Sequence, residues 1–143
     1  MGFDGLIQHL DAENDDKIHF IVSAHVGSAH CHLFTHLTTM DAQFIAGITS
    51  TKALMRRVSA AREYGMYVID LTHVKRKRRL GQLLQAVEAV KDGHRYMLRR
   101  AGYKHWMVEK PKVVVFCRDA ITQKLLGVAP EYELCKWKQW GVI

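Results

Sequence analysis

The chain has 143 residues, of which 48% are hydrophobic, and it carries a formal net charge of +7 with a pI near 9.5. A chain of this size buries a hydrophobic core without disulfides or structural metals, so we expect one domain. No apolar run is long enough to span a membrane, and the amino terminus lacks a basic and apolar leader pattern, so we expect neither membrane insertion nor secretion. Three widely spaced cysteines without a C-x-x-C pair exclude a disulfide framework and indicate an intracellular, reducing compartment.

The charges are unevenly distributed along the chain. Residues 1–16 contain five acidic residues and no Lys or Arg, whereas residues 75–112 contain twelve Lys or Arg against three acidic residues. We therefore expect an acidic N-terminal segment over residues 1–16 and a single α/β domain over residues 17–143. A basic central region favours a polyanionic partner, with nucleic acid ahead of an anionic membrane surface, and a solvated charged face is the alternative.

The first half of the chain alternates predicted strands and helices. In order, the pattern predicts a turn or short helix over residues 2–10, a strand over 17–23, a helix over 30–40 and a strand over 44–48. A further helix is predicted to run through residue 64, with Thr49, Ser50 or Thr51 as its capping residue. The segment AHVGS places a glycine-containing turn between the first strand and its helix. This is the layout of a phosphate-binding loop, because exposed amides at a helix start attract anions.

The second half begins with the run Tyr67-Val68-Ile69, which predicts a buried strand that ends in the carboxylate of Asp70. The elements expected after it are a helix over residues 80–90 closed by Asp92-Gly93, an irregular hairpin or projecting loop over 95–109, a strand over 112–117, a helix over 120–127 and an edge strand over 135–143. Strands that alternate with helices imply βαβ units and a mostly parallel, five-stranded sheet.

Five segments of the chain carry a resemblance to a known family. They are DDKIHFIV, YVIDL, AVEAVKDGHRYMLRRAGYKHW, PKVVVFCRD and the pair Lys136-Trp137. Their order resembles the superfamily 3 helicase domain of Rep proteins, the replication initiators of circular single-stranded DNA viruses. In that family the segments correspond to the strand before Walker A, Walker B, a helix with a basic hairpin, motif C and a closing Arg-Trp pair. The resemblance implies a three-layer P-loop NTPase core of the AAA+-like kind, ATP and Mg²⁺ as cofactors, a hexameric homo-oligomer and a role in DNA replication.

The predicted nucleotide-binding loop departs from the family pattern. Alignment of AHVGSAHCH with Gly-x-x-Gly-Lys-Ser places Gly27 on the first glycine and Ser28 after it, and the remaining positions are filled by His30, Cys31 and His32. Cys31 replaces the lysine that binds the β and γ phosphates, and His32 replaces the hydroxyl residue that binds Mg²⁺. The resemblance therefore implies a degenerate Walker A loop that binds nucleotide weakly.

The expected catalytic positions are also altered. Asp70 corresponds to the Walker B carboxylate that would hold Mg²⁺, although a strand-end aspartate that caps a turn is the alternative. Arg118 replaces the asparagine of motif C that orients the attacking water. The lysine, the hydroxyl residue and the asparagine of the family pattern each typically contribute about 10²- to 10³-fold to catalysis. Because all three are replaced here, we expect ATP hydrolysis to be poor or absent. Lys52 and Lys91 are the nearest candidates to replace the missing lysine, and the pattern brings neither to the loop.

Two groups of cationic residues are predicted to bind nucleic acid. The first is Lys75, Arg76, Lys77, Arg78 and Arg79, and the second is Arg95, Arg99, Arg100 and Lys104. The first group would contact phosphates without reading sequence. The second alternates with Tyr96, Tyr103 and Trp106, a mixture typical of single-strand-binding surfaces, and core or subunit-contact aromatics are the alternative. In the resembling helicases this hairpin projects into the channel of a hexamer and grips the strand. The tract KRKRR is also compatible with a nuclear-import signal.

Five metal-ligand or nucleophilic residues gather in a short stretch of the sequence. They are His25, His30, Cys31, His32 and His36. His32 and His36 share one face of a helix and are compatible with a transition metal, and Cys31 beside histidines is compatible with a thiolate nucleophile. No closed structural metal spacing and no orienting group are present, so polar loop and helix-face histidines are the preferred interpretation.

The leading hypothesis is a degenerate helicase domain that binds single-stranded DNA or RNA, or acts as an assembly component of a larger ribonucleoprotein, with little or no ATP hydrolysis. An active ATP-dependent superfamily 3 helicase in replication is the first alternative. A structural protein-interaction module, whose basic face docks an acidic partner in a ribonucleoprotein, is the second.

Overall fold

The computed structural model describes residues 4–12, 16–22, 41–60, 62–99, 102–128 and 136–142. Its elements in chain order are α1 (Asp4–Ala12), β1 (Ile18–Val22), β2 (Ala42–Ile45), α3 (Thr51–Ala60), β3 (Met66–Asp70), α4 (Lys77–Lys91), β4 (His94–Arg99), β5 (Gly102–Met107), β6 (Lys112–Cys117), α5 (Gln123–Leu126) and β7 (Trp137–Val142). The helix predicted over residues 30–40 lies outside the described residues.

Five of the strands form one sheet in the order β2-β3-β6-β1-β7, and every neighbouring pair is parallel. This confirms the predicted α/β class with a parallel five-stranded sheet. The middle strand β6 is buried from Val113 to Cys117. Strands covered on both faces carry continuous apolar runs, which is why KVVVFC gave the strongest strand signal. The last strand, β7, lies at an edge of the sheet, as expected.

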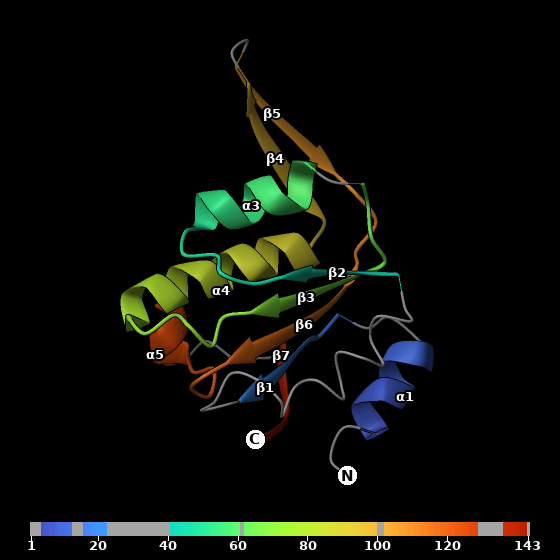
Figure 1. The fold of residues 1–143 in the computed structure, drawn as a ribbon, viewed down its shortest axis with the longest axis vertical. Helices are drawn as coiled ribbons and strands as arrows, with labels where there is room; N and C mark the ends of the chain where they lie inside the picture. The colour runs from blue at the N-terminus through green and yellow to red at the C-terminus, as the bar shows by residue number, and fades with distance from the viewer. Residues whose placement is uncertain are drawn as a thin grey trace.

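Helices cover both faces of the sheet (Figure 1). The larger core lies under α3, α4 and α5 and includes Phe20, Tyr67 and Val115 of the sheet. On the other face, Leu6 and Leu10 of α1 are buried in a second core cluster, so part of the acidic segment belongs to the packed domain. Helix, sheet and helix form the three layers expected of a P-loop-like core. Within the described ranges, no helix is long and apolar enough to cross a membrane.

Some element boundaries differ from the sequence prediction. Strand β2 ends at Ile45 and not at residue 48, because Gly47 adopts a left-handed conformation with φ +74°. Helix α3 ends at Ala60, and its start is capped by Ser50, whose Oγ accepts a hydrogen bond from the Ala53 amide at 3.1 Å. Helix α5 is a single turn that begins at Gln123.

Helix α4 begins before the residue at which the apolar spacing places it. It starts at Lys77 and not at Leu80, so that Lys77, Arg78 and Arg79 form its first turn. The residue before it, Arg76, offers no side-chain cap to the helix amides. Of the five cations in residues 75–79, which we call the basic tract, three therefore belong to the first turn of α4, and the other two directly precede it.

Residues 94–99 and 102–107 form two antiparallel strands in regular register, so the predicted hairpin is present and only its predicted irregularity was wrong. Figure 1 shows that β4 and β5 project beyond α3. At the base of the hairpin, Gly93 has φ +92°, and a Cβ there would lie 2.3 Å from the carbonyl oxygen of Val108. The amide of Val108 in turn donates to the Gly93 carbonyl at 2.9 Å. Only glycine fits this close approach, which explains the Asp92-Gly93 signal at the helix end.

Gly81→Ala is expected to destabilise the domain even though alanine is the better helix former. A Cβ at Gly81 would lie 2.1 Å from the carbonyl oxygen of Leu125, so α5 would have to move away from α4. The gain in helix propensity is about 1 kcal/mol. Overpacking against backbone costs about 3 kcal/mol, so we expect a net loss of about 2 kcal/mol in urea unfolding followed by circular dichroism.

The matched control is Gln82→Ala, at the exposed position next to Gly81 in the same helix. It should change the free energy of unfolding by less than about 0.5 kcal/mol. A Gly81→Ala variant as stable as this control would contradict the close packing of α4 and α5.

Candidate functional site

Asp70 is the last residue of β3 and lies at the carboxyl edge of the sheet. Its Oδ1 accepts two hydrogen bonds from Thr72, one from the amide at 2.9 Å and one from the hydroxyl at 2.6 Å. The interpretation of Asp70 as a turn-capping residue is thus confirmed. Its Oδ2 makes no hydrogen bond within the described part of the chain. Carboxylate oxygen is a ligand type that Mg²⁺ prefers, and Mg²⁺ binding through this oxygen stays a prediction.

Arg118, at the position predicted for motif C, bonds to the same residue as Asp70, namely Thr72. Its Nε donates to the carbonyl oxygen of Thr72 at 2.7 Å, and the Leu71 amide donates to the carbonyl of Phe116 at 2.8 Å. These bonds join the ends of β3 and β6. A guanidinium has donors and no acceptor, so Arg118 cannot accept a hydrogen bond from a water molecule as the carbonyl oxygen of an asparagine side chain can. The preceding residue, Cys117, is buried, and burial raises the pKa of its thiol to about 12.

The loop predicted to bind nucleotide lies outside the described residues. This applies to Gly27, Ser28, His30, Cys31 and His32. The same is true of His25 and His36. Strand β1 ends at Val22 opposite Cys117, so the chain enters that loop next to the end of β6. Among the described residues, no group of three or more His, Cys, Asp or Glu side chains is arranged to hold a metal ion.

Lys91 is excluded as a replacement for the missing loop lysine. Its side chain is 1% exposed, and its Nζ donates to the carbonyl oxygen of Pro111 at 2.8 Å. Pro111 precedes β6, so Lys91 lies at the amino edge of the sheet, opposite to the edge where β1 ends. Lys91 therefore serves to join α4 to the start of β6.

The five cations of the basic tract, residues 75–79, are all exposed. They surround the start of α4, and the first turn of this helix contains no acidic residue. Helix starts carry a partial positive charge and favour acidic residues, so this arrangement concentrates positive potential. Lys75, Arg76, Lys77 and Arg78 make no ion pair within the residues that the structure describes.

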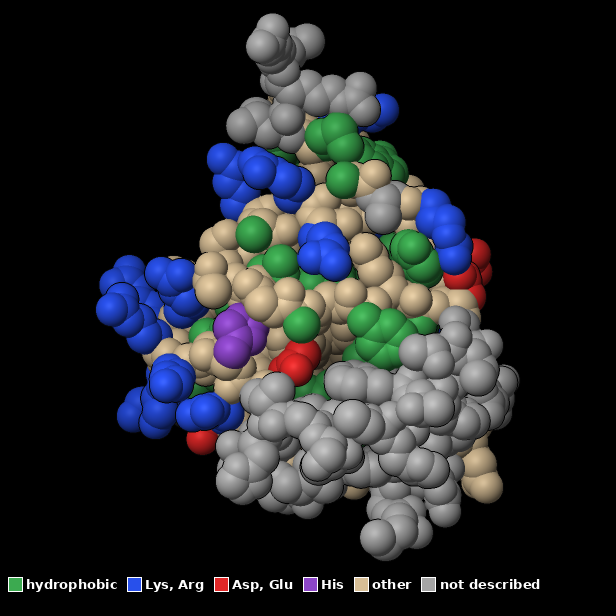
Figure 2. All heavy atoms as spheres, in the orientation of Figure 1, with side chains coloured by type: hydrophobic (Ala, Val, Ile, Leu, Met, Phe, Trp, Pro, Cys, Tyr) green, Lys and Arg blue, Asp and Glu red, His purple; other side chains and the backbone are tan. Residues whose placement is uncertain are grey.

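The basic tract is joined to the start of α3. Arg79 donates to the carbonyl oxygen of Thr49 at 2.9 Å, and His73 Nε2 lies 2.8 Å from the carbonyl oxygen of Ile48. Lys52 and Arg56 of α3 are exposed close to this junction. Figure 2 shows Lys and Arg side chains gathered along one side of the molecule, over the starts of α4 and α3. We call the exposed side chains of residues 52, 56 and 75–79 the cationic surface.

Arg95 does not belong to a nucleic-acid surface, and its predicted role there is wrong. The side chain is 0% exposed, and its NH1 donates to the carbonyl oxygens of Val90 at 3.3 Å and His94 at 2.8 Å. The guanidinium carbon lies 5.3 Å from the centre of the Tyr67 ring, in the larger core. Arg95 therefore fixes the hairpin to the sheet and is not available to a ligand.

The structure describes the other three predicted hairpin cations to different extents. Lys104 is exposed, with its Nζ 5.5 Å above the ring of Trp106. Only the backbone of Arg99 is described, as the last residue of β4 opposite Gly102. Arg100 lies outside the described residues. The role of these three in nucleic-acid binding stays a prediction.

One face of the hairpin carries a row of aromatic rings that the sequence analysis identified only in part. The rings of Tyr96 and His105 stack at 4.9 Å, those of His94 and His105 at 5.3 Å, and Tyr103 lies 5.7 Å from Tyr96. His94 Nδ1 and His105 Nε2 are 3.1 Å apart. Tyr103 is 63% exposed, the largest value among the described large hydrophobic side chains. The sequence contains a signal for this face: in HRY and in YKH the rings stand two residues apart, and residues two apart in a strand lie on the same face.

Comparison of the chain with protein-family models and with curated proteins finds no match. The fold, the cationic surface and the hairpin are therefore the observations on which a function can be built.

Asp70→Ala is expected to destabilise the domain by about 2 kcal/mol, because it removes a charged acceptor from the amide and hydroxyl of the buried Thr72. Asp70→Asn keeps an acceptor oxygen and should lose about half as much. Urea unfolding measures both values. Asp119→Ala, at an exposed acidic position after β6, is the matched control. Equal stability of Asp70→Ala and Asp119→Ala would disprove the turn-capping role.

Proposed function

We propose that this protein binds single-stranded nucleic acid through its cationic surface and its hairpin, as a degenerate relative of Rep-type helicase domains that hydrolyses ATP poorly or not at all. The observation that carries the proposal is the cationic surface. Exposed Lys and Arg side chains from α3, from the start of α4 and from the two residues before α4 lie together, and the first turn of neither helix contains an acidic residue. A polyanion is the partner that such a surface attracts most strongly.

Phosphate contacts account for the affinity. Each Lys or Arg that neutralises a phosphate releases a condensed counterion, and this gain in entropy drives binding without sequence recognition. The side chains of Lys75 to Arg78 are suited to this role because they are exposed and have no ion-pair partner within the described residues. An acidic neighbour would compete with the phosphates, and none lies in the first turn of α4.

Aromatic side chains favour a single strand over a duplex. Tyr103 is 63% exposed on β5, next to the exposed Lys104. Bases in a duplex are stacked on one another and cannot reach such a ring, whereas unpaired bases stack on aromatic side chains with a gain of about 1–3 kcal/mol each. The hairpin therefore adds a contact that only a single strand makes.

The resemblance to superfamily 3 helicases supports the proposal through the order of the elements. Strand β3 with Asp70, helix α4, the hairpin and β6 follow one another as they do in the resembling family. The departures concern catalysis: the sequence lacks the loop lysine and hydroxyl, and Arg118 bonds to the Thr72 carbonyl in place of a water-orienting amide. We therefore propose that the domain keeps the fold and the strand-binding surface but not efficient hydrolysis, alone, as a homo-oligomer or within a ribonucleoprotein.

The salt dependence of binding tests the phosphate contacts. The logarithm of the association constant for a labelled single-stranded oligonucleotide should fall linearly with the logarithm of salt concentration. In the double variant Lys75→Ala/Arg78→Ala the slope should be smaller by about 0.7 for each phosphate contact that is lost. Fluorescence anisotropy at several salt concentrations measures this slope.

The matched control is Lys110→Ala/Lys138→Ala, which removes the same charge elsewhere. Lys110 precedes β6 at the amino edge of the sheet, and Lys138 lies over Trp140 at the face covered by α1. If both double variants reduce the slope equally, net charge and not the cationic surface determines binding. If no single strand binds but an acidic protein does, the interaction-module hypothesis replaces the proposal.

A working ATP-dependent helicase is the second candidate, and one observation favours it. Asp70 keeps a carboxylate oxygen without a hydrogen bond in the described part of the chain, at the edge where β1 leads into the loop. Mg²⁺ with a bound triphosphate would occupy this edge in a P-loop enzyme.

ATP turnover separates the two candidates. The protein with Mg²⁺ is expected to hydrolyse ATP no faster than its Asp70→Asn variant, with or without single-stranded nucleic acid. The physical reason is the loss of three groups that each typically contribute about 10²- to 10³-fold. Release of phosphate measures the rate. Turnover that a single strand stimulates, and that Asp70→Asn abolishes, would establish an unconventional helicase and refute the degenerate interpretation.

A further inference from the structure

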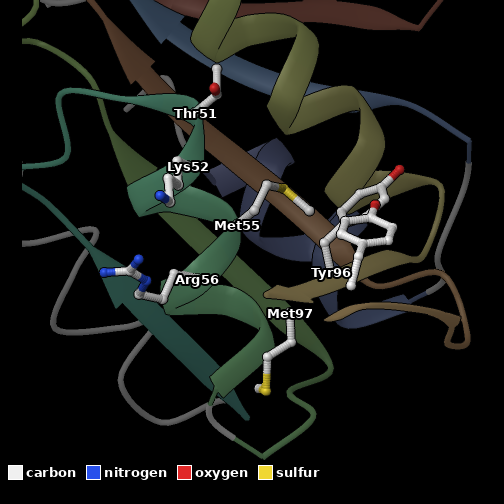
Figure 3. Close-up of a pocket in the computed structure, with 7 residues that line it drawn as sticks. Thr51, Lys52, Met55, Arg56, Tyr96 and Met97 are labelled. Atoms are coloured by element: carbon white, nitrogen blue, oxygen red, sulfur yellow. The ribbon is translucent and has the colours of Figure 1, made fainter. Parts of the chain in front are cut away.

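A pocket of about 520 Å³ lies between the first half of α3 and the hairpin (Figure 3). Its lining side chains come from two segments that are about forty residues apart in sequence: Lys52, Met55 and Arg56 from α3, and Tyr96, Met97 and Tyr103 from the hairpin. Its volume is in the range of pockets that hold small organic ligands. None of the Lys and Arg residues that the sequence predicted to bind nucleic acid lines this pocket.

Aromatic rings and thioethers form one side of the pocket. In Figure 3 the side chain of Met55 extends from α3 toward Tyr96. Tyr96 is held in place by its ring stacking on His105 at 4.9 Å and by a hydrogen bond from its amide to Ser59 Oγ at 3.1 Å. Tyr103 lies beside it, tilted by 35°. Thioether sulfur and aromatic faces are polarizable surfaces that suit a flat, π-bonded ligand.

Two cations form the other side. Lys52 and Arg56 are one turn apart on α3, so their side chains share one face of the helix. Figure 3 shows both on the side of Met55 that is away from Tyr96. Neither makes an ion pair within the described ranges of the chain. A ligand that fits both sides has a flat ring at one end and an anionic group at the other.

We propose that this pocket binds one base of a single-stranded nucleic acid, with the ring against Tyr96 and Tyr103 and the flanking phosphates against Lys52 and Arg56. The proposal rests on the proposed function and assigns it a site for the base. Charge complementarity favours a nucleotide within a strand over an isolated one, because the cationic surface continues from Lys52 through the Arg79–Thr49 contact to the basic tract. A strand has phosphates on both sides of the bound base, and a free nucleotide does not.

The test compares two labelled probes of equal length and charge: oligodeoxythymidylate and an abasic oligomer. The wild-type protein should bind the probe with bases more tightly. Tyr103→Ala should weaken binding of that probe by about 5- to 150-fold, the range expected for one stacked base, and leave binding of the abasic probe unchanged. Lys52→Ala and Arg56→Ala should weaken binding of both probes and reduce the salt slope by about 0.7 each.

Met107→Ala is the matched control for Tyr103→Ala. Both side chains are large and exposed on β5, at 55% and 63%, and Met107 does not line the pocket. Met107→Ala should bind both probes like the wild type, and circular dichroism should show all variants folded.

Three outcomes would overturn the pocket assignment. Equal wild-type affinity for both probes would exclude a base contact while the salt-dependent binding of the proposed function stands. Displacement of the probe by thymidine monophosphate at the affinity of the oligonucleotide would indicate a free nucleotide as ligand. Polyglutamate that binds with the same dependence on Tyr103 would indicate an acidic protein segment. Failure to bind either oligonucleotide would refute the proposed function itself.

Discussion

The parallel arrangement of all five strands is the constraint on which the other features depend. In a parallel sheet the strands end at one common edge, and the helices that follow them start there. This places Asp70 at the end of β3 and Arg118 after β6 within reach of the same residue, Thr72, whose amide and hydroxyl donate to Asp70 and whose carbonyl accepts from Arg118. It also brings the first turns of α3 and α4 together, and their cations with them. The parallel sheet therefore brings Asp70 and Arg118 to one edge, and the same topology brings the cations of the cationic surface together.

The hairpin depends on a different interaction, the burial of Arg95. Burial of a guanidinium is costly unless its donors are bonded, and here two carbonyls accept from NH1 while Nε and NH2 have no hydrogen bond. Glu63 Oε2 lies 3.7 Å from Nε, and the Tyr67 ring lies below the guanidinium carbon. The cation thus joins β4, the loop before β3 and the sheet. With its base held in this way, the hairpin packs against α3, where the Tyr96 amide donates to Ser59 Oγ and the rings of Tyr96 and Tyr103 line the pocket between the two elements.

The sequence predicted the parts of the fold that a local pattern specifies. Strand β6 was predicted with the observed bounds because a strand buried on both faces is continuously apolar. The start of α4 was missed because no capping residue marks it and cations at a helix start oppose the usual preference. Arg95 was misassigned because charged side chains are rarely buried completely. The pocket could not be predicted from the sequence, because Lys52 and Met55 approach Tyr96 only through the packing of α3 on the hairpin.

The distribution of charge connects stability to the proposed function. Lys77, Arg78 and Arg79 in the first turn of α4 repel one another and the helix dipole, and Arg76 offers no cap to the helix amides. A domain selected for stability alone would carry Asp, Ser or Thr at this position. Phosphates bound at the helix start would relieve the repulsion and accept hydrogen bonds from the uncapped amides. Binding and folding free energy are then linked, because a ligand that binds only the folded chain offsets the cost that these cations impose. The same residues that weaken the free domain would give the bound one its affinity.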